Sequence, residues 1–214
     1  MSKIRHVIWD WNGTLLDDVD VCVSVLNDLL KVRGLPNVTR DLYKRRFGFP
    51  VRPFYADLGF DVSEGAFEDL SHEFIGAYKI ALHAVQLHKG ALDVMADLAD
   101  HLDGQFVISA MEHNMLGLML NDYGVMPLLR DHQGTSNLQA GSKVEVGVTK
   151  MQALGLRGEE LLLVGDTEHD LELARALGCA CVLHAGGHQS RERLALTGCP
   201  VVDDLEGVLS VVRG

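Results

Sequence analysis

Apolar and polar residues recur along the chain in two rhythms, one typical of buried strands and the other of amphipathic helices. A short apolar run at residues 4–9 is rich in β-branched and aromatic side chains and ends in a polar turn. This pattern predicts a strand buried on both faces. Apolar residues recur at helical spacing over residues 18–32, and Gly34 follows them as a stop signal. The chain therefore begins with a predicted strand and a predicted helix.

The rest of the chain divides into a helical stretch and a stretch in which strands and helices alternate. Residues 39–47 and 63–82 have helical patterns, with no convincing strand between them. Beyond residue 90 the pattern predicts helices at residues 91–102, 112–123, 143–154, 170–177 and the C-terminal end, and strands at residues 105–109, 161–164, 180–183 and 201–202. Such alternation implies a parallel sheet with helices on both faces. We expect an α/β fold, a doubly wound, Rossmann-like parallel sheet.

The early helical stretch fits poorly into that sheet. We expect residues 16–87 to form an inserted helical unit that leans over the strand ends, and residues 1–15 and 88–214 to form the α/β core. The chain has 214 residues, which allows one ordinary domain or a core with a modest insertion.

Composition narrows the class of protein. The chain has 19 basic and 30 acidic residues, a formal charge of −11, which argues against nucleic-acid or anionic-membrane surfaces. No apolar run approaches the roughly 20 residues needed to span a bilayer, and the first ten residues lack a signal-peptide pattern. The four cysteines are too few and too unevenly spaced for a disulfide scaffold. We expect a reduced, cytoplasmic protein, either a monomer or a homodimer.

Polar side chains stand at the ends of three predicted strands. In parallel sheets, ligands bind at the carboxyl ends of the strands, which here points to Asp10, Ser109 and Asp166. Asp10 and Asn12 lie two residues apart in an extended segment, so their side chains share a face. Gly13 then allows a sharp turn whose backbone amides can meet an anion.

Together these ends gather three carboxylates, a hydroxyl and a lysine. The carboxylates are those of Asp10, Asp166 and Asp170, and the lysine is Lys143, which opens a predicted helix. Clustered carboxylates repel one another unless a cation lies among them, and oxygen ligands of this kind suit Mg²⁺. A carboxylate beside Mg²⁺, a lysine and a hydroxyl is suited to nucleophilic attack on a phosphoryl group.

Four signatures in this order resemble the haloacid dehalogenase-like hydrolase superfamily over essentially the whole chain. They are residues 10–14 (DWNGT), Ser109, Lys143, and Gly165-Asp166 with Asp170. Within the superfamily the chain looks closest to the phosphoglycolate-phosphatase-like branch, and the helical unit looks like the family's α-helical cap. The resemblance implies a Mg²⁺-dependent phosphohydrolase acting on a small phosphorylated metabolite.

The same resemblance implies roles for individual residues. Asp10 would attack phosphorus and form an aspartyl-phosphate, with Lys143 assisting. Mg²⁺ would be held by Asp10, the backbone carbonyl of Asn12 and Asp166, with support from Asp170. The phosphoryl oxygens would be held by Ser109, Lys143 and Thr14. In the cap, Arg46 or Arg52, on either side of residues 47–50 (FGFP), would meet an anionic part of the substrate. A solvated helix face is the simpler explanation of this basic stretch.

One residue departs from the family pattern. Phosphatases of the family usually carry Asp where this chain has Asn12, and that carboxyl protonates the leaving oxygen. An amide cannot exchange a proton near neutral pH. Another group could replace it, the substrate could need little protonation, as an acyl or aryl phosphate does, or turnover could be slow, with ligand binding as the role. The possible replacements are Glu112, His113, Glu168 and His169.

Other interpretations also stay open. A phosphonatase-type C–P hydrolase would need a cap lysine that forms a Schiff base, for which Lys44 and Lys79 are available. A metal-free dehalogenase is disfavoured by the carboxylates in the fourth signature. Thiols and imidazoles at Cys179, Cys181, His184 and His188 could bind zinc, but the spacing and the apolar surroundings favour buried strand residues.

Overall fold

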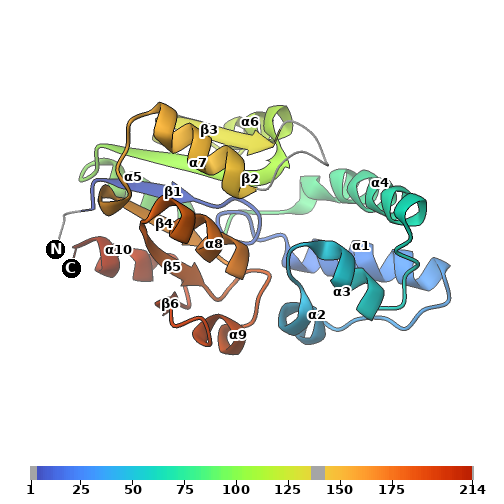
Figure 1. The fold of residues 1–214 in the computed structure, drawn as a ribbon. Helices are drawn as coiled ribbons and strands as arrows, with labels where there is room; N and C mark the ends of the chain where they lie inside the picture. The colour runs from blue at the N-terminus through green and yellow to red at the C-terminus, as the bar shows by residue number, and fades with distance from the viewer. Residues whose placement is uncertain (1–3, 136–142, 214) are drawn as a thin grey trace.

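Six parallel strands form the centre of the molecule. The computed structural model describes residues 4–135 and 143–213. Its single sheet has the strand order β3-β2-β1-β4-β5-β6 (Figure 1). The strands are β1 (His6–Trp9), β2 (Gly104–Glu112), β3 (Asp131–Thr135), β4 (Leu161–Gly165), β5 (Ala180–His184) and β6 (Val201–Val202). The predicted α/β class with a parallel sheet is confirmed.

Side chains of each strand alternate between two apolar layers. In β1, Val7 and Trp9 belong to one buried cluster and Ile8 to the other. Because both faces of β1 are covered, its last three residues form a continuous apolar run rather than an alternating pattern. The first layer is covered by α5 (Ala91–Ala99), α6 (His113–Asp122) and α10 (Glu206–Arg213), and the second by α7 (Lys143–Ala153) and α8 (Glu168–Leu177).

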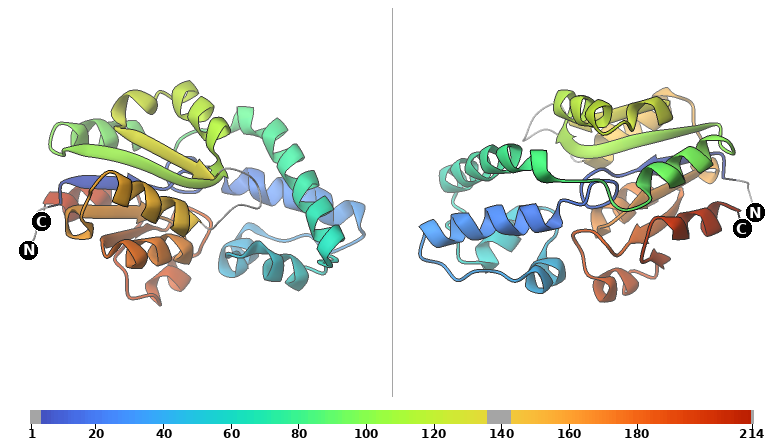
Figure 2. Two further views of the ribbon diagram at one scale, coloured as in Figure 1. Left: turned by 45° about the horizontal axis from the view of Figure 1, so that its top comes forward. Right: turned by 180° about the vertical axis from the view of Figure 1, so that it is seen from behind.

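A group of helices lies beyond one end of the sheet, as two further views show (Figure 2). Apart from isolated bridges, the described residues of this helical unit contain no strand, as the sequence pattern predicted. Its elements are α1 (Val19–Val32), α2 (Arg40–Arg46), α3 (Val51–Asp57), α4 (Glu64–Ala81) and the 3-10 turn η1 (Leu82–Ala84). The boundaries at residues 15/16 and 87/88 remain a prediction.

The chain enters and leaves the helical unit through two segments that lie side by side. Leu16 and Leu87 form an antiparallel bridge. On either side of it the Asp17 amide donates to the Gln86 carbonyl at 2.9 Å, and the His88 amide donates to the Leu15 carbonyl at 2.8 Å. The two connections are therefore hydrogen-bonded to each other.

Three elements were not predicted from the sequence. The edge strand β3 (DHQGT) has almost no apolar residues, and α3 carries Pro53 in its first turn. The helix α9 (Arg191–Ala195) is only five residues long. The remaining short elements are the 3-10 turns η2 (Met126–Leu128) and η3 (Gly158–Glu160).

Among the described residues, no helix combines the length and the apolar character needed to cross a membrane.

Candidate active site

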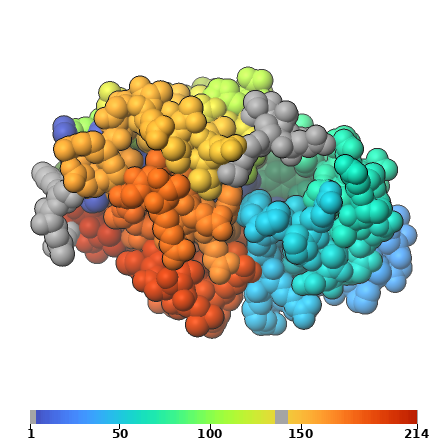
Figure 3. Space-filling model, viewed as in Figure 1, coloured from blue at the N-terminus to red at the C-terminus, as the bar shows by residue number. Residues whose placement is uncertain are grey.

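Asp10, Ser109 and Asp166 lie at one edge of the sheet and line one cavity, as the strand pattern predicted. The cavity has a volume of about 1210 Å³ and is bounded on its other side by α4 and by the segment between α2 and α3. A space-filling view shows the blue to teal surface of the helical unit meeting the orange and red surface of the core (Figure 3). The site therefore lies between the two parts of the molecule.

Lys143 lies between two buried carboxylates. Its ammonium group donates to Oδ1 of Asp10 and, at 2.5 Å, to Oδ1 of Asp170. Burial raises the pKa of Asp10 to about 6, although the Lys143 charge opposes the rise. Burial alone would lower the pKa of Lys143, but the charges of the two carboxylates outweigh it and raise that pKa. The ammonium group therefore stays charged and fixes one oxygen of Asp10.

Asp166 accepts its hydrogen bonds from neutral donors. Its Oδ1 accepts from the Thr14 hydroxyl at 3.0 Å, and its Oδ2 accepts from the backbone amide of His188 at 2.5 Å. Burial, with added repulsion from Asp10 and Asp170, raises the pKa of Asp166 well above its usual value, although the charge of His188 opposes the rise. The surroundings of Asp166 therefore favour its protonated form, and its ionised form needs additional positive charge nearby.

Asp170 is fixed by the start of α8. Its Oδ2 accepts from the backbone amides of Asp166 and Thr167 and from the Thr167 hydroxyl, at 3.1, 3.0 and 2.8 Å. Thr167 and Asp170 form a capping box, which satisfies amides at the helix start. Gly165 is needed because a Cβ there would lie 2.2 Å from Cγ of Asp170. Residues 165–170 thus end the strand β4, let the Asp170 side chain approach the backbone of Gly165 closely, and cap the helix α8.

The three carboxylates can share a cation. Asp10, Asp166 and Asp170 are all buried, and each offers an oxygen within 4.8 Å of the others'. When these three carboxylates are ionised, the single ammonium group of Lys143 leaves an excess of negative charge in a buried site. Hard oxygen donors at this spacing suit Mg²⁺. The residues present therefore fit the metal that the sequence predicts.

Asn12 belongs to a buried hydrogen-bond network that the sequence analysis did not find. Its amide nitrogen donates to Oδ2 of Asp18 at 2.8 Å and to the Tyr78 hydroxyl at 2.7 Å, and that hydroxyl donates to the same Oδ2 at 2.5 Å. Oδ1 of Asp18 accepts from the Gly13 amide at 2.8 Å. Since Tyr78 lies in α4 of the helical unit, the network ties that unit to the turn after β1.

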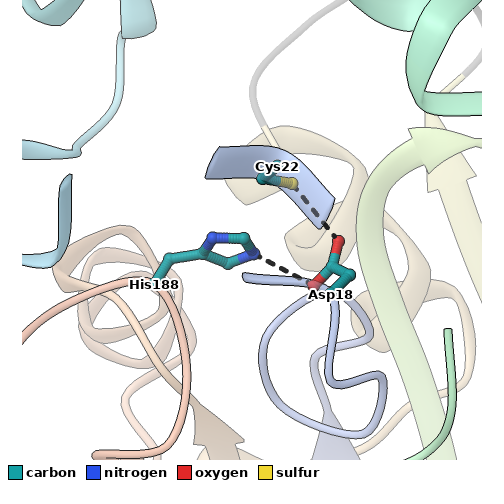
Figure 4. A group of neighbouring side chains, drawn as sticks. All are labelled: Asp18, Cys22 and His188. Atoms are coloured by element: carbon teal, nitrogen blue, oxygen red, sulfur yellow. Dashed lines mark hydrogen bonds and ion pairs between the residues drawn. The ribbon is translucent and has the colours of Figure 1, made fainter. Parts of the chain in front are cut away.

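His188 completes the network from the core. Its Nε2 lies 3.2 Å from Oδ1 of Asp18, and Nδ1 lies 2.9 Å from the Tyr43 hydroxyl of α2. Figure 4 shows the imidazole and the Cys22 thiol directed at different oxygens of the Asp18 carboxylate. Burial lowers the pKa of His188, but Asp18 outweighs it and raises the value to about 9. Although Asp18, Cys22 and His188 are close enough to share a metal, each already has a hydrogen-bond or ion-pair partner, and we interpret them as a network.

No local signal marks this network in the sequence. Asp18 follows the first motif as a simple helix start, and its partners Tyr78 and His188 lie 60 and 170 positions away. Only the tertiary fold brings Asp18, Tyr78 and His188 together.

The other predicted binding residues divide between those at the cavity and those away from it. Ser109 is buried, lines the cavity and accepts from the Met111 amide at 3.1 Å. Arg52 also lines the cavity, with its guanidinium 4.5 Å from the centre of the Phe67 ring. Thr14 contacts Asp166 rather than the cavity, and Arg46 is exposed outside the cavity lining.

None of the four possible replacements for an acid at position 12 bonds to the Asn12 amide within the described part of the chain. Glu112 caps α6 by accepting from two backbone amides, and Glu168 pairs with Arg193. His169 lies 2.8 Å from Glu172, and His113 stacks on His132. Glu112 and His169 do line the cavity.

The lysines of the phosphonatase interpretation and the residues of the zinc interpretation lie in different parts of the molecule. Lys44 of α2 donates to the Ala185 carbonyl at 2.9 Å, and Lys79 of α4 lines the cavity. Cys179 and Cys181 pack against the second apolar layer. His188 lies in the active-site network instead of beside them.

Comparisons with known proteins agree with this architecture. A phosphoglycolate phosphatase of Photorhabdus laumondii is 47% identical over 203 residues, covering 92% of this chain and 87% of that protein. An N-acetylmuramic acid 6-phosphate phosphatase of Pseudomonas putida is 27% identical over 184 residues, covering 82% of this chain and 80% of that protein. A haloacid dehalogenase-like hydrolase from Streptococcus pneumoniae shares the fold, with a TM-score of 0.83, 19% identity and 99% of each chain covered.

The family model for haloacid dehalogenase-like hydrolases matches residues 7–184, a span that contains all four signatures and the helical unit. This chain belongs to the haloacid dehalogenase-like hydrolase family.

Proposed function

We propose that the protein is a phosphohydrolase that cleaves the phosphate ester of a small molecule, with Asp10 as the nucleophile. The observation that carries the proposal is the placement of Asp10. Its carboxylate follows the central strand, lines the cavity and has one oxygen fixed by Lys143. The relatives named as phosphatases support the same reaction class.

The chemistry needs little more than position and charge. Oδ2 of Asp10 would attack phosphorus, the bond from phosphorus to the leaving oxygen would break, and an aspartyl-phosphate would form. Water would then attack phosphorus and release the Asp10 carboxylate. Lys143 and Ser109 both line the cavity and would hold phosphoryl oxygens, and phosphoryl transfer depends mainly on such positioning and charge neutralisation.

Mg²⁺ is the cofactor that this site fits. Asp10 and Asp166 would hold the ion together with the backbone carbonyl of Asn12, and Asp170 would support it. When bound, it would neutralise charge on the phosphoryl group and on the carboxylates. The chain's own contribution is to keep these oxygens close together through the contacts of Thr14, Lys143 and the start of α8.

Phosphate release from acetyl phosphate and a panel of small phosphate esters tests the proposal. Wild-type protein should release phosphate with Mg²⁺ and lose this activity in EDTA, and Asp10→Asn should lose at least about 10³-fold. Asp100→Asn is a matched control because Asp100 is an exposed carboxylate at the end of α5. Full activity of Asp10→Asn would refute the proposal.

A phospho-ligand-binding protein with little turnover is the second candidate. The observation that favours it is Asn12, which holds no exchangeable acid proton. Mg²⁺-dependent binding of inorganic phosphate by calorimetry, with no release from any ester or from acetyl phosphate, would select this function over the first.

A further inference from the structure

The Asn12 amide has no hydrogen left for a leaving group. Its two N–H bonds are directed at Asp18 Oδ2 and at the Tyr78 hydroxyl, at 2.8 and 2.7 Å. If the amide were flipped, its oxygen would face the Asp18 carboxylate oxygen, and the two acceptors would repel each other. The amide therefore offers the cavity only Oδ1, which accepts hydrogen bonds and donates none.

The other polar groups around Asp10 do not supply the missing proton. Lys143 already donates to Asp10 and to Asp170. Glu112 lines the cavity, but its carboxylate accepts from the amides of Asn114 and Met115, both at 2.9 Å. A carboxylate that accepts two backbone hydrogen bonds is held in its ionised form. His188 and His169 also line the cavity, but the two ring nitrogens of His188 contact Tyr43 and Asp18, and Nδ1 of His169 lies 2.8 Å from Glu172. We therefore expect a leaving oxygen beside Asn12 to depart as an anion.

The cavity is much larger than a phosphoryl group and its immediate substituents need. Its volume of about 1210 Å³ exceeds the roughly 300–1,000 Å³ typical of pockets for drug-sized ligands. Much of its wall on the side of the helical unit is aromatic or aliphatic, and includes Phe47, Phe49, Phe67, Phe74, Ile75 and Tyr55. Phe49 is 45% exposed, and its ring lies 5.1 Å from that of His169 across the boundary with the core. Such walls favour a flat apolar group.

These two features restrict the leaving group in different ways, and an aryl group satisfies both. We propose that the natural substrate is an aryl phosphate, a monoester in which the leaving oxygen is attached to an aromatic ring that occupies the space beside α4. The inference rests on the proposed phosphatase function and names its substrate class. A phenolate is far less basic than an alkoxide, so it leaves without a proton donor.

The steps balance without an acid. An oxygen of Asp10 forms a bond to phosphorus, the bond from phosphorus to the aryl oxygen breaks, and the electron pair stays on that oxygen as a phenolate, which takes a proton from solvent. Water then attacks phosphorus and passes its proton to the departing phosphate, and the Asp10 carboxylate is regenerated. The Asp10 carboxylate is itself a good leaving group from phosphorus, so this second step also needs little acid help.

A comparison of phenyl phosphate with benzyl phosphate tests the leaving group. The two esters carry the same ring but differ greatly in the basicity of the leaving oxygen. Because general acid catalysis contributes about 10²–10⁴-fold, we expect kcat/KM for phenyl phosphate to exceed that for benzyl phosphate by at least about 100-fold. Equal values for the two esters would overturn the inference.

A pair of isoleucines in α4 tests where the ring lies. Ile75 lines the cavity, whereas Ile80 is 75% exposed outside it. Ile75→Ala should raise KM for 2-naphthyl phosphate about fourfold more than KM for acetyl phosphate, because it removes about one methylene's worth of apolar contact with the ring. Ile80→Ala is the matched control and should leave both values unchanged.

Acetyl phosphate separates failure of this inference from failure of the proposed function. If neither acetyl phosphate nor phenyl phosphate releases phosphate with Mg²⁺, the phosphatase function itself fails. If acetyl phosphate is cleaved but aryl esters are no better than alkyl esters, the function stands and the aryl inference is wrong. If acetyl phosphate far exceeds every aryl ester and Ile75→Ala has no selective effect, the substrate is an acyl phosphate and the inference is again wrong.

Discussion

Substitution of Asn12 by Asp should destabilise the protein, although it restores the residue usual in the family's phosphatases. In the structure the Asn12 amide donates to a carboxylate oxygen of Asp18, which is 1% exposed, and to the Tyr78 hydroxyl. An Asp at position 12 has no N–H to donate and brings a second negative charge against Asp18. The variant therefore loses two hydrogen bonds and gains a repulsive contact.

The size of the effect follows from these contacts. A hydrogen bond to a charged acceptor contributes about 1.5–3 kcal/mol and one to a neutral acceptor about 0.5–1.5 kcal/mol. Tyr78 can turn its hydroxyl toward the new carboxylate and recover part of this. We expect Asn12→Asp to lower the free energy of unfolding by about 2–4 kcal/mol at pH 7.5, or the melting temperature by about 5–15 °C.

The pH dependence of this effect has a definite sign. Repulsion by Asp18 raises the folded-state pKa of the new carboxyl above the roughly 3.9 of an unfolded chain. Its ionisation therefore costs stability as the pH rises above about 4, up to the folded-state pKa. Asn12→Asp should be closer to wild type at pH 5 than at pH 7.5.

A double-mutant cycle with Asp18→Asn isolates the pair. In Asn12→Asp/Asp18→Asn the donor and the acceptor exchange places, so an amide again faces a carboxylate. Urea unfolding of the four proteins should give a double variant at least about 1.5 kcal/mol more stable than the sum of the single effects predicts. Stability of Asn12→Asp within about 0.5 kcal/mol of wild type, or strictly additive effects, would refute the reasoning.

Three further outcomes are expected. Mg²⁺ at a hundredfold excess over its Kd should stabilise the wild type by about 2.7 kcal/mol, and Asp166→Asn should lose most of that shift; equal shifts in a thermal melt would argue against the site. Gly187→Ala should also lose it, because a Cβ there would lie 2.2 Å from Oδ2 of Asp166 and 2.4 Å from the Gly13 carbonyl, whereas an unchanged Mg²⁺ response would contradict this packing argument. Burial lowers the pKa of His184 to about 3, so only the unfolded state takes up its proton below about pH 6.5. Stability should fall there by up to about 1.4 kcal/mol per pH unit, and His184→Leu, compared with wild type from pH 6.5 to 4, should lack that component.

Most of the sheet could be predicted because its strands are buried on both faces. The run before Asp10 and the run before Gly165 are continuous in apolar residues, so pattern alone marks them. The strand β3 has no such run, since it lies at the sheet edge with three of its five residues only partly buried. Its pairing with β2 is a property of the assembled sheet rather than of its own composition.

The same distinction holds at the site. Asp10, Asp166 and Asp170 stand beside strand ends that the sequence marks, and topology then brings them together. The partners of Asn12 carry no such mark, because Tyr78 lies near the C-terminal end of α4 and looks like an ordinary apolar-face residue. Long-range hydrogen bonds of this kind follow from how the helical unit sits on the core, which no local pattern specifies.

The bridge between Leu16 and Leu87 has a consequence for the order of folding. The central strand β1 is made first, but its neighbours β2 and β4 begin only at Gly104 and Leu161. The pairing of Leu16 with Leu87 short-circuits the chain between β1 and β2, because the residues between 16 and 87 are then bypassed. The effective loop between the two strands becomes roughly four times shorter. Closing it then costs about 1 kcal/mol less conformational entropy. An insertion that folds early thus brings distant parts of the sheet nearer in effective chain length and favours pairing of the central strands.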